Sequence, residues 1–307
     1  MLTSLVQRAN RNNVPGEKPS WFEKNTYRLL ISPTVILLLS IFVFPIVLAF
    51  VMSFQKITLR TMNDPPFVGI DNYTAIFEGD RLLNATRVTF LNLVLVVTGS
   101  LTFGLVLALV YHQEFWGRGI ARTFAVIPMM LTPAALALIM KTMYHPTVGV
   151  FNYWLESLGF EPYLWTYSQA TVIPAVALIQ VYQYSPLAML FALGGLASLP
   201  TEPYEAAVVD GASWWQTFWY LTFPLLRPHL FIAALILTID VMKQFDIIWI
   251  MSAGGPGIAS ETFNILLYKK AWSFYRWGEA AAFGMVFLVL MVIITLIFLR
   301  YRRSEKY

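Results

Sequence analysis

The sequence predicts an all-α integral membrane fold with six transmembrane helices. Three observations support this: 58% of the 307 residues are hydrophobic, only 12% are charged, and several long runs carry no charge. Soluble domains contain roughly 25% charged residues, and a run of about 20 apolar residues crosses a hydrocarbon core of roughly 30 Å. The sequence also lacks cysteine, which rules out a disulfide framework and a cysteine-ligated zinc site.

The expected spans follow from runs that lack Asp, Glu, Lys and Arg. Five such runs are long enough to cross a membrane: 29–54, 88–111, 123–140, 170–199 and 280–299. A sixth span, about 225–251, is apolar except for Asp240, Lys243 and Asp246, and its length indicates a span despite these charges. The expected domains are a tail at 1–28, a six-helix domain at 29–300 and a tail at 301–307.

The distribution of basic residues predicts the orientation. With six spans both termini lie on one side, which carries 12 Lys and Arg residues against 7 on the other. Cytoplasmic loops are enriched in Lys and Arg, so both termini are expected in the cytoplasm. The basic residues form no dense run, which indicates membrane lipid and not nucleic acid as their surroundings.

The segment 198–228, between the fourth and fifth spans, is long for a connection between neighbouring membrane helices. Thr201 is expected to cap a first short helix. Acidic residues and a proline in the first turn suit a helix N-terminus, and here they are Glu202, Pro203 and Glu205. The segment is therefore expected to be folded and not to be an open loop.

A second short helix is expected after a turn. Asp210-Gly211 is expected to end the first helix, with Asp210 able to cap the N–H groups that follow. Ser213 and Gln216 form a capping-box pattern, which predicts a helix from Ser213 to about Leu221. Its aromatic surface, which should pack on the bundle or a partner or lie on lipid, consists of Trp214, Trp215, Phe218, Trp219 and Tyr220.

This segment, about 198–224, resembles the EAA loop of bacterial ABC-importer permeases. The shared spacing is E-A-A-x-x-D-G-A with downstream Phe and Pro, and the matching residues are Tyr204-Glu205-Ala206-Ala207, Asp210-Gly211-Ala212, Phe218, Pro224 and Pro228. The sequence departs from the family in its aromatic density, because Trp214-Trp215 and Trp219-Tyr220 replace polar and basic residues that are common there.

Two further stretches are similar to carbohydrate-uptake permeases, of the first-permease type found in maltose and glycerol-3-phosphate importers. Phe67-Val68-Gly69-Ile70-Asp71-Asn72-Tyr73 resembles the pattern F-x-G-x-x-N-Y/F. The second stretch begins at the Phe245-Asp246 pair and continues with Gly254-Gly255-Pro256, Thr262 and Tyr268. The resemblance therefore covers most of the chain outside the polar N-terminal tail.

The resemblance implies a half-channel in the bacterial cytoplasmic (inner) membrane. Its implied partners are a second permease, forming a heterodimer, two ATPase subunits and an extracytoplasmic solute-binding protein. ATP and Mg²⁺ would be bound by the ATPase, so this chain is expected to hold no cofactor. In the family the EAA loop contacts the ATPase, which implies that role for Glu205, Ala206, Ala207, Asp210, Gly211 and Ala212.

The sequence contains no recognisable catalytic or metal-binding motif. It has no G-x-x-x-x-G-K-[ST] phosphate loop, its three histidines are far apart, and it has no G-x-S-x-G elbow. We therefore expect no catalytic residue, no metal site and no enzymatic activity in this chain.

Charged, amide and aromatic side chains within the spans are candidates for a solute path. They are Asp240, Lys243, Gln244, Asp246 and Trp249 on the fifth span and Gln180, Gln183 and Tyr184 on the fourth. Asp240, Lys243 and Gln244 are expected to share one helix face. Charges at membrane depth usually face a water-filled cavity, although these groups could equally serve only to join helices.

Two other functions stay open at this point. A self-contained secondary transporter or channel would use Asp240, Lys243 and Asp246 as a proton relay and need no ATPase. A structural subunit would use the aromatic segment only to hold a partner. For an importer, the expected solute is a sugar or sugar derivative, neutral or weakly anionic, since few cations are available to the path.

Overall fold

The computed structural model describes residues 21–78 and 80–304. The chain divides into two compact units, Met1–Met52 and Ser53–Tyr307. In the first unit the described residues form one helix, α2 (Trp21–Met52), which contains most of the expected span 29–54. Its stretch Asn25–Met52 is long enough to cross a membrane and contains an 18-residue window with a mean hydropathy of 3.1. Most of the expected tail at 1–28 lies outside the described residues, as do residues 305–307.

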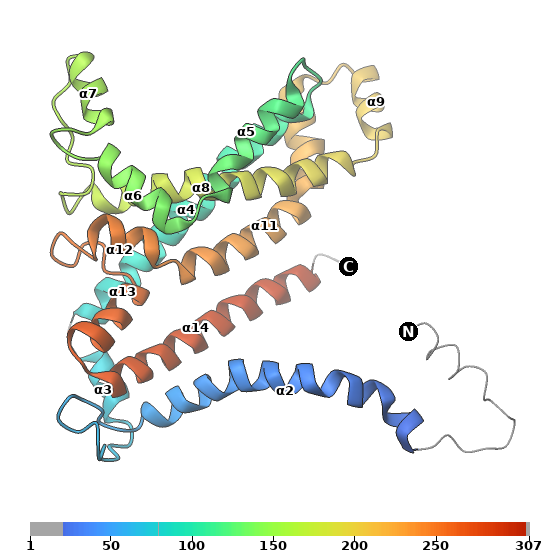
Figure 1. Cartoon of the computed structure of the whole chain (residues 1–307). Helices are drawn as coiled ribbons and strands as arrows, with labels where there is room; N and C mark the ends of the chain where they lie inside the picture. The colour runs from blue at the N-terminus through green and yellow to red at the C-terminus, as the bar shows by residue number, and fades with distance from the viewer. Residues whose placement is uncertain (1–20, 79, 305–307) are drawn as a thin grey trace, which may run out of the picture. The chain divides into compact units, whose positions relative to one another are not determined.

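The second unit is helical throughout its described elements (Figure 1). In chain order these are α3 (Asp71–Phe77), α4 (Arg81–His112), α5 (Arg118–Met130), α6 (Pro133–Met143), α7 (Val150–Ser157), α8 (Val172–Ala197), α9 (Glu202–Val209), α10 (Trp214–Thr217), the π-helix η1 (Phe218–Thr222), α11 (Phe223–Lys243), α12 (Asp246–Ser252), α13 (Phe263–Tyr268), the π-helix η2 (Lys269–Ser273) and α14 (Trp277–Ser304). Figure 1 shows α7 and α9 beyond opposite ends of α8.

Membrane-spanning helices are confirmed at most of the expected positions. Among the described residues, five helical runs are long and apolar enough to cross: α2, α4, α8, the run from α10 to α11, and α14. The expected spans at 88–111, 170–199 and 280–299 fall on α4, α8 and α14. An all-helical membrane fold is thus confirmed, with a sixth span only if α5 and α6 are taken together.

The expected span at 123–140 is not one continuous helix. The chain forms α5 and α6, which meet at an angle of 95°. The break follows from Pro133, because a proline disfavours helical backbone at the preceding residue, and Thr132 is extended with ψ of 141°. The hydroxyl of Thr132 then accepts the N–H of Ala135 at 3.4 Å and caps α6.

The expected span at 225–251 is also corrected. The helix begins at Trp214 and runs through η1 and α11 to Lys243, and α12 is a separate helix. Gln244 is extended at the end of α11. There the Asn264 amide donates to the carbonyl oxygens of Met242 (2.8 Å) and Gln244 (3.2 Å), so carbonyls at the helix end gain partners.

Part of the core of the second unit lies where α4 packs on α8. Ser100, Gly104 and Ala108 recur every four residues and are buried on one face of α4. A side chain at Gly104 would come within 2.6 Å of the Ala188 Cβ atom on α8. Only a glycine there allows the two backbones to approach so closely, as in other membrane helix pairs.

The stretch Phe67–Tyr73 fixes the segment that precedes it. The buried Asn72 amide donates to the carbonyl oxygens of Ser53 (2.8 Å) and Gln55 (2.9 Å), and the hydroxyls of Tyr73 and Ser53 lie 2.7 Å apart. A Cβ atom at Gly278, near the start of α14, would overlap the Gln55 carbonyl oxygen. The motif is therefore a structural clamp between this segment, α3 and α14.

Candidate functional site

The segment after α8 forms two helices, as expected. The first, α9 (Glu202–Val209), has Glu202, Pro203 and Glu205 in its first turn and no buried residue. The expectation that Thr201 caps it is wrong, because the Thr201 side chain makes no capping hydrogen bond. Its backbone is already helical, with ψ of −29°, whereas a capping residue usually has an extended backbone.

The end of α9 is a Schellman turn centred on Gly211. The N–H of Ala212 donates to the carbonyl oxygen of Ala207 (2.9 Å), and that of Gly211 donates to Val208 (3.1 Å), which is the pattern of this motif. Gly211 has a φ of 72°, in the left-handed region that favours glycine. The expected helix end at Asp210-Gly211 is confirmed.

The second helix begins with the expected capping box. The Ser213 hydroxyl accepts the Gln216 backbone N–H (3.4 Å), and the side-chain amide oxygen Oε1 of Gln216 accepts the Ser213 N–H (2.7 Å). The expected end near Leu221 is wrong, since α10 continues through η1 into α11. The second short helix is thus the beginning of a run long and apolar enough to span a membrane.

A groove of about 550 Å³ lies between α9 and the α10–η1 run. Its lining residues are Pro203, Ala206, Ala207, Asp210, Gly211, Ala212, Gln216, Thr217, Tyr220 and Leu221. Five of the six residues expected to contact the ATPase therefore line one surface, while Glu205 is exposed on α9. The Tyr204 hydroxyl donates to the Thr222 hydroxyl at 3.2 Å, which joins α9 to η1.

An ion pair occupies the far end of the same helical run. The Lys243 ammonium nitrogen lies 3.0 Å from an Asp240 carboxylate oxygen, and the two side chains are 59% and 38% exposed. Charged groups are costly against lipid and usually face a bundle interior or water. We therefore expect this surface of α11 to face a water-filled path or a neighbouring subunit.

The other candidates on the fifth span do not share that helix face. Gln244 follows the end of α11 and is buried, and Asp246 begins α12. Trp249 is partly buried, with its ring centroid 4.6 Å from that of Tyr268 and 5.6 Å from that of Phe245. The expectation of one face for Asp240, Lys243 and Gln244 is wrong because the helix breaks after Lys243.

The candidates on α8 are placed between helices. Gln180 is fully buried and accepts a hydrogen bond from the Asn92 amide of α4 at 3.1 Å. Gln183 is also buried, and its amide donates to the Leu131 carbonyl oxygen at 3.1 Å. Tyr184 is partly buried beside Val96, Ala177 and Val241. Both glutamines join α8 to neighbouring segments, which is a known role of amides in membrane bundles.

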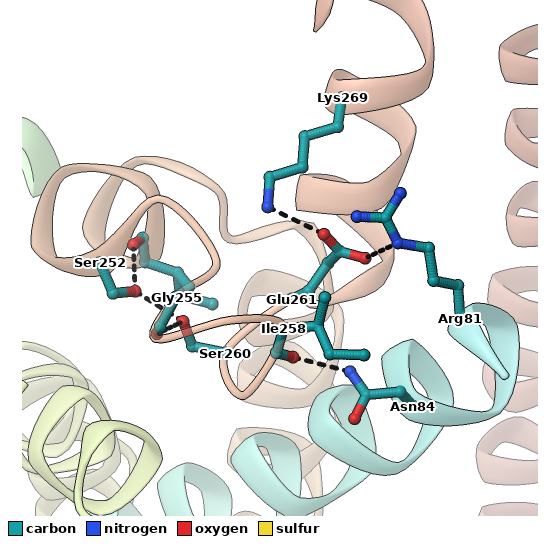
Figure 2. Close-up of polar contacts among 9 residues, drawn as sticks. Arg81, Asn84, Ser252, Gly255, Ile258, Ser260, Glu261 and Lys269 are labelled. Carbon is teal, nitrogen blue, oxygen red and sulfur yellow. Dashed lines mark hydrogen bonds and ion pairs between the residues drawn. The ribbon is translucent and has the colours of Figure 1, made fainter. Parts of the chain in front are cut away.

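Sequence reasoning missed a network around Glu261, whose side chain is fully buried (Figure 2). Its carboxylate lies 2.8 Å from the Lys269 ammonium nitrogen and 3.3 Å from Arg81 Nε. The Arg81 guanidinium also lies over the Phe274 ring, 5.2 Å from its centroid. A glutamate within the otherwise uncharged stretch 247–268 was the available signal, because a buried charge requires a partner.

Hydrogen bonds fix the rest of the loop between α12 and α13 (Figure 2). The hydroxyls of Ser252 and Ser260 lie 2.7 Å apart, and Ser260 donates to the Gly255 carbonyl oxygen at 2.6 Å. The Asn84 amide of α4 donates to the Ile258 carbonyl oxygen at 2.7 Å. The loop that contains Gly254-Gly255-Pro256 is therefore an ordered structure attached to α4.

The second unit thus combines helices long enough to cross a membrane with an exposed helix, α9, beside a groove. A family model described as "binding-protein-dependent transport system inner membrane component" matches residues 100–305. The chain belongs to this family. It is a permease of the ABC type. Membership of this family does not support the alternative function, that of a self-contained secondary transporter.

Relatives extend the match to nearly the whole chain. The sulfoquinovosyl glycerol transport system permease protein SmoG of Agrobacterium fabrum is 33% identical over 90% of this chain and 90% of its own. The trehalose/maltose transport system permease protein MalF of Thermococcus litoralis is 30% identical over 91% of this chain and 94% of its own.

A solved structure has the same fold. It belongs to a bacterial ABC transporter involved in the import of the acidic polysaccharide alginate. The match has a TM-score of 0.80 and covers 92% of this chain and 97% of that chain, with 19% sequence identity. At this identity the likeness concerns the fold alone.

Proposed function

We propose that this chain forms half of the translocation path of an ATP-driven importer for a sugar or sugar derivative. A second, different permease supplies the other half, and an extracytoplasmic solute-binding protein delivers the solute. Two separate ATPase subunits bind ATP and Mg²⁺, and this chain has no catalytic role. The names of SmoG and MalF support a sugar-like solute.

The observation that carries this proposal is the groove between α9 and the α10–η1 run. It is lined by small side chains at Ala206, Ala207 and Ala212 and by the backbone of Gly211, so a helix or loop of a partner can approach closely. No residue of α9 is buried. An exposed helix with small residues beside a groove is suited to contact an ATPase subunit.

The same geometry explains how closure of the ATPase subunits would move the helices that line the translocation path. The Tyr204–Thr222 hydrogen bond and the Schellman turn connect α9 to η1. From there the helix is continuous to Lys243, at the Asp240–Lys243 ion pair. A displacement of α9 by closing ATPases is therefore transmitted along a single helix to charged groups that face the path.

This assignment places the groove in the cytoplasm. Figure 1 shows α14 ending toward the same end of the second unit as α9, which supports a cytoplasmic C-terminus. A cytoplasmic N-terminus follows if α5 and α6 together count as one crossing. Loop residues 253–262 and α7 then face the extracytoplasmic side.

For the solute path we retain the exposed pair Asp240 and Lys243 and the partly buried Tyr184 and Trp249. Gln180, Gln183 and Gln244 are buried in this chain, whereas the exposed Asp246, on the same helix as Trp249, also remains a candidate. Aromatic rings and hydrogen-bonding groups suit a hydroxyl-rich solute. Because Asp240 neutralises the one cation on this surface of α11, Lys243, the expected solute is neutral or weakly anionic.

Co-purification from detergent tests the proposal. Tagged wild-type chain should bring down an ATPase subunit, and the double variant Glu205→Arg, Gly211→Pro should not, because both changes disturb the contact surface. Gly211→Asn is the matched control, since asparagine tolerates left-handed backbone and should keep the ATPase. If wild type brings down no ATPase, or if the double variant retains it, the proposed contact is wrong.

A further inference from the structure

Three tryptophans surround one buried ring at the start of the α10–η1 run. Trp214, Trp215 and Trp219 are 58%, 62% and 53% exposed, and we call them the tryptophan cluster. The Phe218 ring beneath them is buried. It stacks on Trp214 at 5.6 Å with an interplanar angle of 11° and meets Trp219 edge-on at 5.1 Å. The cluster is therefore a built aromatic surface with its rings held in place.

The tryptophan cluster is separate from the groove that contacts the ATPase. On the α10–η1 run the groove is lined by Gln216, Thr217, Tyr220 and Leu221, and by none of the three tryptophans. The run thus presents one set of residues to α9 and a different set elsewhere. An ATPase seated in the groove would leave the tryptophan cluster for another partner.

The length of the helix indicates that this other partner is the lipid headgroup layer. The run Trp214–Lys243 has 30 residues, which gives a helix of about 45 Å. A hydrocarbon core is about 30 Å thick and a bilayer with its headgroups about 40–45 Å. A helix of this length centred in the bilayer extends about 7.5 Å beyond the core at each end. Asp240 and Lys243 then lie at one boundary of the core, and roughly the first five or six residues of the helix fall within the opposite headgroup layer.

The chemistry of the cluster fits that layer. An indole ring combines a large apolar surface with one N–H donor, and Trp is enriched where lipid headgroups meet acyl chains. The surface is also continuous with a membrane-spanning helix, so no separate docking step is needed. A purely apolar surface of Leu or Ile would have indicated the hydrocarbon core instead.

We propose that Trp214, Trp215 and Trp219 insert into the headgroup–acyl boundary of the phospholipid bilayer and set the depth of this helix end in the membrane. The Schellman turn at Gly211 joins α9 to the same helix end. The inference depends on the membrane span and not on the proposed ATPase partner.

Spin labels test this proposal directly, because the chain has no cysteine of its own. Trp215→Cys and, as matched control, Val209→Cys on α9, which is 87% exposed, each receive one nitroxide. Trp214→Cys and Trp219→Cys repeat the test, each with two tryptophans left in place. The assembled permeases, with partner subunits that carry no reactive cysteine, are studied in lipid nanodiscs with and without ATPase.

We expect the label at 215 to collide several-fold more often with dissolved oxygen than with a water-soluble nickel complex, and the label at 209 to show the reverse. Adding ATPase should shield position 209 and leave position 215 unchanged. Water-like accessibility at 215 would overturn the lipid anchor. So would shielding at 215 that appears only with ATPase, which would identify a protein as the occupant. A label at 209 that ATPase fails to shield would count against the proposed function alone.

Discussion

The ammonium nitrogen of Lys269 lies 2.8 Å from a carboxylate oxygen of Glu261, whose side chain has no exposed surface. Arg81 of α4 provides a second cation at 3.3 Å. The π-helix η2 places the next residue, Lys270, 2.8 Å from Glu279 of α14. Two consecutive lysines of η2 therefore pair with two glutamates, and Arg81 attaches the loop 253–262 to α4 through Glu261.

We predict that Glu261→Gln destabilises the permease by about 3 kcal/mol, because removal of one partner leaves buried charge uncompensated. The unfolding midpoint in detergent should fall by roughly 5–10 °C. Thermal unfolding of the purified chain, followed by loss of the monodisperse species, measures this. Glu279→Gln is the control, since the Glu279 side chain is 18% exposed whereas that of Glu261 is fully buried. An equal loss in both variants would contradict the special role of Glu261.

Gly278→Ala should be strongly destabilising. The added methyl group would overlap the Gln55 carbonyl oxygen, which the Asn72 amide holds in place. We expect a loss of about 2–4 kcal/mol, as for other overpacked sites, visible as a lower unfolding midpoint. Gly119→Ala in α5 has open space around it and should be neutral or stabilising by up to about 1 kcal/mol. Wild-type stability in the first variant would disprove the clamp.

The spans that the sequence predicted correctly are those in which the apolar run coincides with a single unbroken helix. α4, α8 and α14 are long apolar helices, and their unbroken hydrophobic runs were sufficient to place them. The α5–α6 break was missed although Thr132-Pro133 is a signal for a helix start, because the hydrophobic run continues across it. The break after Lys243 depends on Asn264, about 20 residues away, and such a tertiary contact leaves no local pattern.

The local structure of the segment 198–224 was predicted more accurately than the contacts between distant segments. Local rules gave the turn at Gly211 and the capping box at Ser213, since both depend on residues within a few positions. Glu261 was missed because its partner Arg81 comes from a distant segment, and a lysine eight residues away, Lys269, forms no recognisable local pattern with it. The clamp by Asn72 was seen only as a family pattern, and its physical role required the positions of the Ser53 and Gln55 carbonyl groups.

Gly211→Ala should weaken the ATPase contact without removing it. Left-handed backbone costs an L-residue roughly 1–2 kcal/mol, and a Cβ atom at this position meets no other atom. The expected result is a several-fold lower yield of co-purified ATPase, with Gly211→Asn close to wild type. If Gly211→Ala gives the same yield of ATPase as wild type while Gly211→Pro abolishes binding, the left-handed backbone of the turn does not determine the strength of the ATPase contact.

Membrane insertion should depend on Asp240 and Lys243 together, so that loss of one charge is more harmful than loss of both. Either single neutral variant leaves one charge alone on a membrane helix, which costs up to about 3 kcal/mol near the bilayer centre and less toward the interface. We expect reduced membrane insertion for Asp240→Asn and for Lys243→Gln. The double variant with both changes should recover expression, as measured by the amount of folded protein in membranes. No recovery in the double variant would mean that each charge has a separate partner.

The most direct test of the account is uptake into proteoliposomes that contain this chain, its second permease, the ATPases and the binding protein. Trehalose, maltose and sulfoquinovosyl glycerol, the solutes named for the relatives, form the test panel. The account predicts accumulation of at least one solute that requires ATP and the ATPase subunits and is unaffected by a protonophore. Uptake by the permeases alone that collapses with the proton gradient would contradict it and support a relay through Asp240 and Lys243.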